Sequence, residues 1–342
     1  MRALRTGSSS QVLGMGGRDL PSGAPAWRCA PGALAAGACL SRRGLVAAAG
    51  LMAGAALLAA TGCVDQHPED HGSAAGGSTK AVADMKIVAT SPACVDICDK
   101  LEMKLVGVPK SNLEATPDRY KDATKVGMAM SPDMEILKSL APDYVISPVS
   151  LISDFKPKYA AARLASIFLN LNSVEGMYAS IADLGRKFEC EEQANALVAE
   201  YDSYMKSYRE ENKGKEAPTC LVLMGLPGSY VVATEYSYVG SLVKLAGGKN
   251  VYAGQTRMFL NANTEDMKAK KPDVILRAAH ALPEQVTEMF NKDFKENDIW
   301  QHFEAVQEGR VYDLPYDQFG MSAKFNYPDA LKTLQPILYG GD

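Results

Sequence analysis

Two stretches of the chain, "EILKSLAPDYVIS" (135–147) and "EDMKAKKPDVILR" (265–277), share one arrangement. In each, a glutamate lies seven residues before the proline of a Pro-Asp pair, and that pair opens an apolar segment typical of a buried strand. A helix-then-strand unit that occurs twice indicates two related lobes. We therefore expect a pseudo-symmetric, bilobal α/β protein.

Short apolar segments around these two units predict further strands. They alternate with helical stretches, which is typical of mostly parallel sheets covered by helices. The expected strands are 86–90, 104–109, 143–147 and 166–170 in the first lobe, and 219–225, 230–234, 273–278 and 311–314 in the second.

Residues 174 to 212 contain no strand signal. In "EEQANALVAEYDSYMKSYREEN" (191–212) apolar residues recur at helical spacing and predict one long helix, with the stripe Leu197, Val198, Tyr201, Tyr204, Met205 and Tyr208. We expect lobes at 85–173 and 216–342, joined by a helical linker at 174–215. Ligands of such folds bind at the carboxyl ends of the strands, hence in the cleft between the lobes.

The amino-terminal segment has the features of an export signal. Arg42 and Arg43 precede an apolar run at 44–60, and the run ends in Ala-Thr-Gly-Cys at Cys63. This pattern resembles a bacterial lipobox, and the pair of arginines resembles a twin-arginine signal. We expect a signal peptide at 1–62, a lipid-modified Cys63, a flexible tether at 63–84 and an extracytoplasmic, membrane-anchored protein. An uncleaved transmembrane anchor is the alternative.

Charge and cysteine content exclude several classes. The net charge of −4 and the lack of a basic patch argue against nucleic acid as a partner. No CxxC motif supports a structural zinc site. Cys94 and Cys98 are one helical turn apart and should pack as small apolar groups, whereas a Cys190–Cys220 disulfide is left open.

Two sites carry side chains suited to a soft metal ligand. In "GMAMSPD" (127–133), Met128 and Met130 precede an expected helix start at Ser131, and His280 follows the strand "DVILRA". Met130 and His280 should both reach the cleft, from opposite walls. Core packing for the methionine and a satisfied loop position for the histidine are the alternatives.

The linker helix, "SLVKLAGGKNVYAG" (241–254) and "IWQHFEAVQEGRVYDL" (299–314) resemble the substrate-binding lipoproteins of iron–siderophore, cobalamin and haem ABC importers. "LVLMGLPGSYVVAT", "PDVILRAAHALPEQV" and "FGMSAKFN" resemble the haem-binding branch of that group, and the likeness runs from about Lys86 to Gly340. It implies a non-enzymatic haem receptor with Met130 and His280 as axial ligands of the haem iron. Met128 is a second thioether that could replace Met130.

The resemblance leads us to seek groups for the rest of the haem. Helix starts and nearby cations could hold the propionates, and Tyr230 could stack on the porphyrin or pack beneath its loop. The candidate contacts are Ser91, Lys110, Ser131, Tyr230, Arg257, Asn263 and Thr264.

The expected partners are haem and an ABC permease dimer with its ATPase. Glu135 and Glu265 hold equivalent positions in the two lobes, as in related importers that engage the permease through one glutamate per lobe. We expect a monomer, with a surface protein that delivers haem as a further candidate partner. The alternatives are a siderophore or cobalamin receptor, a zinc or manganese receptor, and a tetrapyrrole chelatase.

Overall fold

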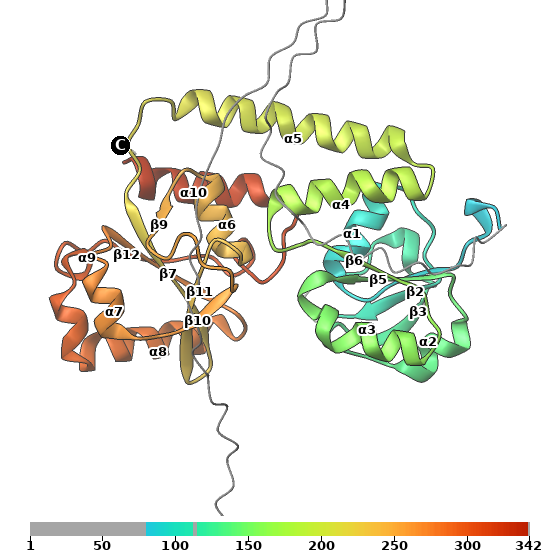
Figure 1. Ribbon diagram of the computed structural model, residues 1–342, viewed down its shortest axis with the longest axis horizontal. Helices are drawn as coiled ribbons and strands as arrows, with labels where there is room; N and C mark the ends of the chain where they lie inside the picture. Colours follow the sequence, from blue (N-terminus) through green and yellow to red (C-terminus); the bar gives the residue numbers. More distant parts are fainter. Residues whose placement is uncertain (1–79, 112–114, 341–342) are drawn as a thin grey trace, which may run out of the picture. The chain divides into compact units, whose positions relative to one another are not determined.

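The computed structural model describes residues 80–111 and 115–340 (Figure 1). The expected signal peptide, Cys63 and most of the tether lie outside the described residues. Within the described part of the chain, no helix has the length and apolar content needed to cross a membrane.

The first lobe is built on a six-stranded sheet with the order β4-β3-β2-β1-β5-β6, in which all pairs except β3–β4 are parallel. The parallel strands place their carboxyl ends along one edge of the sheet. The strands are β1 (Ile87–Ala89), β2 (Gly107–Lys110), β3 (Thr124–Met128), β4 (Ser131–Pro132), β5 (Tyr144–Pro148) and β6 (Ser166–Leu169).

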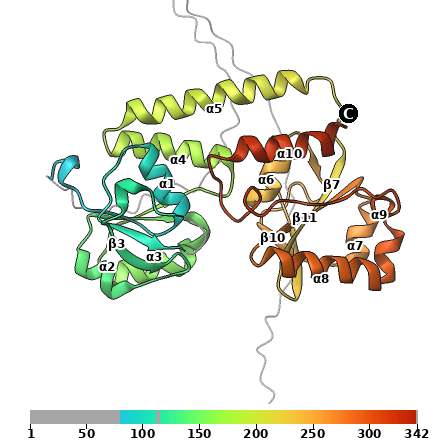
Figure 2. The same ribbon diagram turned by 180° about the vertical axis from the view of Figure 1, so that it is seen from behind.

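Helices cover both faces of this sheet (Figure 2). Ile87 and Ala89 point to the side of α1 and α4, whereas Val88 points to the side of α2 and α3. This alternation buries both faces, as expected for a parallel sheet. The helices are α1 (Pro92–Lys100), α2 (Met134–Leu140), α3 (Ile152–Ala161) and α4 (Val174–Lys187), with short turns η1 (Val82–Asp84), η2 (Asp118–Tyr120) and η3 (Val149–Leu151).

The second lobe has the sheet order β10-β8-β7-β11-β12, with β9 paired to β7. The strands are β7 (Thr219–Leu226), β8 (Ser229–Ala233), β9 (Lys249–Asn250), β10 (Phe259–Asn261), β11 (Val274–Ala279) and β12 (Val311–Asp313). The helical elements are α6 (Tyr238–Leu245), α7 (Thr264–Ala269), α8 (Pro283–Glu296), η4 (Asp298–His302), α9 (Glu304–Gln307) and α10 (Tyr327–Tyr339). Mixed α/β lobes confirm the expected fold class.

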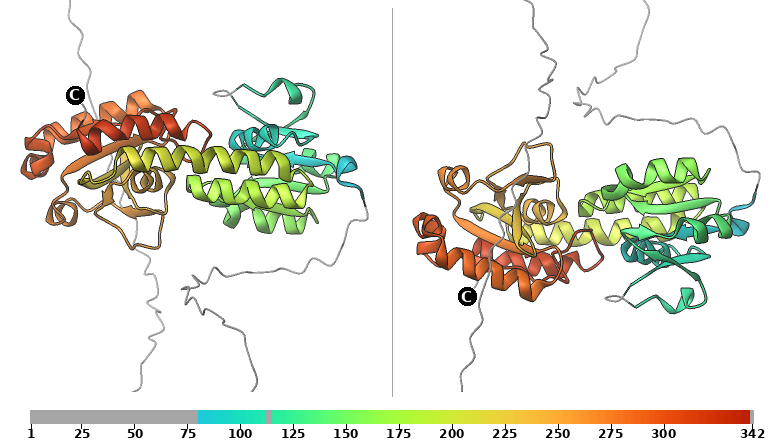
Figure 3. Two further views of the ribbon diagram at one scale, coloured as in Figure 1. Left: turned by 90° about the horizontal axis from the view of Figure 1, so that it is seen from above. Right: turned by 90° about the horizontal axis from the view of Figure 1, so that it is seen from below.

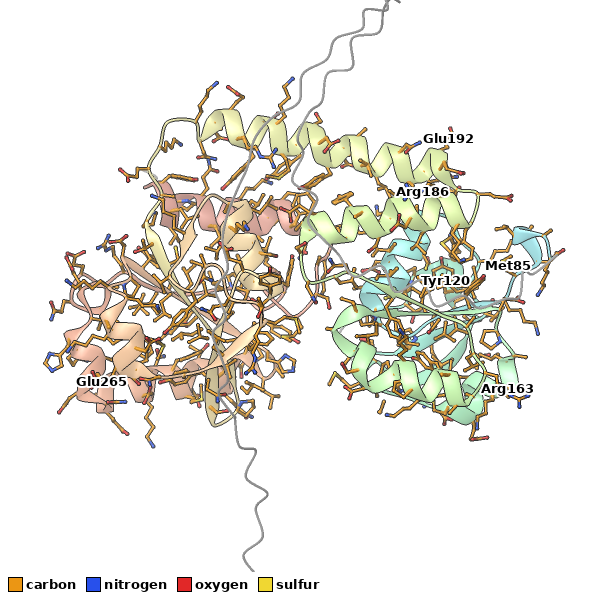
Figure 4. The ribbon with its side chains drawn as sticks, in the orientation of Figure 1. Met85, Tyr120, Arg163, Arg186, Glu192 and Glu265 are labelled. Carbon is orange, nitrogen blue, oxygen red and sulfur yellow. The ribbon has the colours of Figure 1, made fainter. Side chains whose placement is uncertain are left out.

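The connection between the lobes contains the expected long helix, and a second helix precedes it. The chain forms α4 and then α5 (Glu191–Glu211), which lie side by side (Figure 3). Glu189 makes the corner with a left-handed backbone (φ 54°). Arg186 and Glu192 in Figure 4 stand on either side of this corner. Tyr201, Met205 and Tyr208 of the expected stripe are buried.

The repeated unit is the same in both lobes, down to its caps. Asp133 caps α2 by accepting from the amides of Glu135 and Ile136, and Asn263 caps α7 by accepting from the amide of Asp266. Each helix ends in a left-handed residue directly before the Pro-Asp pair, at Ala141 and Lys271. The shared backbone path confirms that the two lobes are related.

The aspartates of the two Pro-Asp pairs also act alike. Asp143 accepts a hydrogen bond from the backbone amide of Lys86 at 2.7 Å, and Asp273 accepts one from the amide of Thr219 at 2.7 Å. Each aspartate therefore joins the start of its strand to the start of the neighbouring parallel strand. Hydrogen bonds from Lys80 and Lys86 lower the pKa of Asp143, and those from the amide and hydroxyl of Thr219 lower the pKa of Asp273.

Candidate functional site

Met130 lies at the tip of a β-hairpin. Gly127 and Met128 of β3 pair with Pro132 and Ser131 of β4, which leaves Ala129 and Met130 as the two turn residues. Gly127 has a φ of 96°, and a Cβ atom there would meet the backbone at 2.8 Å, so only glycine fits. Met130 is 69% exposed, which excludes core packing for this thioether.

His280 follows the last residue of β11 directly. Its backbone N–H donates to the carbonyl of Gly225 at 2.9 Å and continues the pairing of β11 with β7. The imidazole is partly buried, and its Nδ1 atom is buried without a hydrogen-bond partner among the described residues. The alternative of a histidine satisfied by its own loop therefore finds no support in the described contacts.

A pocket is lined by residues of both lobes. It is lined from the first lobe by Ser150 and Asn172, which follow β5 and β6, and from the second by Met224, Ser237, Tyr238, Val239, Met258, Phe259, Gly320 and Met321. Met224 is the register partner of Ala278, two residues before His280. When the two helix-then-strand copies are aligned, Ser150 corresponds to His280. Neither Met130 nor His280 lines this pocket, although His280 follows β11, the strand that pairs with β7 of Met224.

The hairpin of Met130 belongs to the same edge of the first sheet. β3 is parallel to β5 and three strands away, about 14 Å at the usual spacing between strands. Lys110 ends β2 and is the register partner of Met128. The exposed Lys110 is therefore the cross-strand neighbour of Met128.

The helix start expected at Ser131 is wrong, and the structure describes the surroundings of Tyr230. Ser131 does not begin a helix but lies in β4, because Asp133 provides the cap of α2. The ring of Tyr230 packs against Phe290 at 5.5 Å between centroids, and its hydroxyl donates to Asp293 at 2.9 Å. Burial and then the Asp293 carboxylate raise the pKa of Tyr230. Its contacts match packing beneath the loop rather than stacking on a ligand.

The remaining candidates occupy helix ends and an exposed loop. The Ser91 hydroxyl caps α1 by accepting from the amide of Cys94, and Asn263 precedes Thr264 at the start of α7. Since β10 pairs antiparallel with β8 and β8 antiparallel with β7, β10 runs parallel to β7, and Asn263 follows its carboxyl end. Arg257 is exposed just before β10.

Glu135 and Glu265 are the second residues of α2 and α7, and both side chains are exposed. Glu265 is labelled in Figure 4 on α7, at the surface of the second lobe. Glu135 forms an ion pair with Lys138 at 2.9 Å. Both glutamates stand in the first turn of a helix, which favours negative charge.

The structure places all four described cysteines and answers the open question of a disulfide. Cys94 and Cys98 are fully buried in the core of the first lobe, as expected for small apolar groups. Cys190 precedes α5, whereas Cys220 lies in β7, and both are free thiols. The Cys190–Cys220 disulfide is therefore absent.

Comparison with known proteins decides the family. The model of a periplasmic binding protein family matches residues 87–317. The chain belongs to the periplasmic binding proteins. As a member of this family, it is a substrate-binding protein rather than an enzyme.

Individual relatives give a narrower likeness. This periplasmic binding protein is 40% identical over 263 residues to the high-affinity heme uptake system protein IsdE of Staphylococcus aureus, which covers 77% of this chain and 89% of that protein. The crystal structure of S. aureus IsdE complexed with heme matches with a TM-score of 0.70 and 39% identity over 75% of this chain and 99% of that one.

An ABC transporter substrate-binding protein from Listeria monocytogenes has a TM-score of 0.71 and 45% identity, over 75% of this chain and 99% of its own. The vitamin B12 binding protein BtuF of Vibrio cholerae, at 17% identity and a TM-score of 0.58 over 74% of this chain and 96% of its own, shares the fold.

Sequence reasoning missed the pocket residues Ser150 and Asn172. The repeat could have indicated Ser150, because it corresponds to His280 in the first copy.

Proposed function

We propose that this protein is the haem receptor of an ABC importer, with Met130 and His280 as axial ligands of the haem iron. The heme uptake relative at 40% identity supports the haem chemistry. A cobalamin or siderophore receptor of the same fold is the second candidate, but it has no need of a paired thioether and imidazole.

One observation carries the ligand assignment. A large apolar side chain that is 69% exposed at the tip of a constrained hairpin has no packing role, and Met130 is such a side chain. His280 provides an imidazole at the equivalent edge of the other sheet. Haem iron accepts this pair of ligands, and the thioether favours the ferrous state. Met128, 45% exposed on the same hairpin, is the substitute ligand.

The propionates of haem need donors of hydrogen bonds or positive charge. Lys110 suits one of them, because it stands beside Met128 on the neighbouring strand. Ser91, Asn263 and Thr264 are further candidates at helix starts. Arg257 precedes β10 at the other edge of the second sheet and is the weakest of the candidates.

The rest of the proposal concerns the membrane. Cys63 would carry the lipid anchor, and the exposed pair Glu135 and Glu265 would dock on the permease. A permease with two-fold symmetry presents the same surface twice, and one carboxylate per lobe matches that arrangement.

A titration tests the haem claim. Purified protein is titrated with haem and, separately, with cobalamin and a ferric siderophore, and binding is followed by the Soret band and by calorimetry. We expect tight binding of haem alone. Tight binding of cobalamin or the siderophore, without haem, would replace the proposal with the second candidate.

Single variants then test the ligands. His280→Ala should lose the low-spin spectrum, and Met130→Ala should lose less affinity because water or Met128 can fill its place. The matched control is His302→Ala, since His302 lies in η4 and is the other histidine of the described residues. Wild-type spectra from both His280→Ala and Met130→Ala would refute the assignment.

A further inference from the structure

Leu282 has a backbone conformation that its position does not explain. Its φ is 48° and its ψ 59°, in the left-handed region that is costly for a residue with a branched side chain. The other described non-glycine residues with positive φ all terminate helices, where this conformation is common: Glu102, Ala141, Arg163, Glu189 and Lys271. Leu282 instead stands at the amino-terminal cap of α8.

The cap position makes Leu282 more unfavourable still. Leucine is a poor cap because its side chain cannot accept a hydrogen bond from the first turn, and none is made here. Only its carbonyl takes part, accepting from the amide of Val286 at 3.1 Å. The side chain is 53% exposed. Backbone, cap and exposure each disfavour leucine, and such conflicts concentrate at functional sites.

The location of Leu282 indicates the function. It follows His280 by two residues, and His280 is held to β7 by its bond to Gly225. The large hydrophobic side chains exposed among the described residues are Met128, Met130, Tyr236 and Leu282. Three of these four therefore belong to the two segments that carry the candidate ligands.

We infer that Leu282 contacts the apolar face of the bound porphyrin beside His280. This inference rests on the proposed haem function. A planar macrocycle ligated by the imidazole must pass close to the turn at 280–282, and the exposed leucine would then bury its side chain against the ring. The left-handed turn serves this contact by directing residue 282 away from the core of the lobe.

The test separates a contact from a structural role. Leu282→Asn keeps the left-handed backbone at low cost and can cap α8, but it removes the apolar contact. We expect the melting temperature of the haem-free protein not to fall, whereas the haem affinity drops about tenfold, as for loss of a half-buried leucine. The low-spin spectrum should persist because His280 is unchanged.

Two further variants complete the experiment. Lys271→Asn changes another left-handed residue, which precedes the amino end of β11, and it should leave the haem affinity unchanged. Leu282→Met should keep the haem affinity near that of the wild type. Wild-type affinity in Leu282→Asn would overturn the inference, as would a fall in melting temperature together with affinity. Failure of the wild type to bind haem would instead refute the proposed function.

Discussion

Replacing Asp273 with alanine should destabilise the protein measurably. The carboxylate of Asp273 accepts hydrogen bonds from the amide and from the hydroxyl of Thr219, each at 2.7 Å. A hydrogen bond to a charged group contributes about 1.5 kcal/mol or more. Because Asp273 is only partly buried, we reduce the summed contribution of the two hydrogen bonds to about 2 kcal/mol. For a protein of more than about 250 ordered residues that is a fall of about 4 °C in melting temperature.

The pH dependence gives the same prediction a second test. The Thr219 amide and hydroxyl lower the pKa of Asp273 in the folded state. The stabilisation is therefore complete above the unfolded pKa and is lost as the pH falls toward the folded pKa. The difference between wild type and Asp273→Ala should be largest near pH 7 and should shrink near pH 3.

Circular dichroism melts at both pH values measure this difference. Glu216→Gln is the control, because Glu216 is highly exposed and lies 3.7 Å from Lys249, so its ion pair should contribute little. Equal melting temperatures of Asp273→Ala and wild type at pH 7 would refute the reasoning. So would a difference that is as large at pH 3.

Three other predictions follow from the described contacts. Tyr230→Phe loses the hydrogen bond to Asp293, so the free energy of unfolding should fall by about 1 kcal/mol while the haem affinity stays the same. Weaker haem binding by this variant would indicate that Tyr230 contacts the haem. In the native protein iodoacetamide should label Cys190 before Cys94, because burial raises the pKa of the Cys94 thiol to about 12. Peptide mass spectrometry measures the order of labelling, and labelling of Cys94 first would contradict this prediction. Glu135→Ala/Glu265→Ala should bind haem normally but support little uptake in cells; normal uptake would exclude these residues from docking.

The sequence predicts best where local signals agree with the fold. β1 and β7 are predictable because each is largely apolar, and β11 because only Arg277 interrupts its apolar residues. The repeated Pro-Asp unit predicts the relation of the lobes. Ser91, Asp133 and Asn263 cap helices with the side chains that favour this role.

The errors arise where tertiary contacts replace local signals. β3 has no strand signal in the sequence, because Thr124, Lys125 and Gly127 interrupt its apolar pattern and pairing with β2 holds it in place. The corner between α4 and α5 has no sequence signal, because Glu189 takes the left-handed conformation there. A glycine at this position would have indicated a turn. Tyr230 was ambiguous because its partner Asp293 is distant in the chain.

For the ligand residues, sequence alone could find Met130 and His280 but could not show their exposure. The hairpin that presents Met130 depends on Gly127 and on pairing with Ser131 and Pro132, which no local pattern in "GMAMSPD" announces. Leu282 has no sequence signal at all, since its backbone conformation and exposure are properties of the folded turn.

Rescue of His280→Ala by free imidazole tests the central claim most directly. If His280 supplies an axial ligand, the haem complex of this variant should lose its low-spin absorbance spectrum and regain it when imidazole enters the vacated position. The same addition to Met130→Ala, in which His280 is intact, provides the comparison. A low-spin spectrum in His280→Ala without imidazole, identical to that of the wild type, would contradict the account.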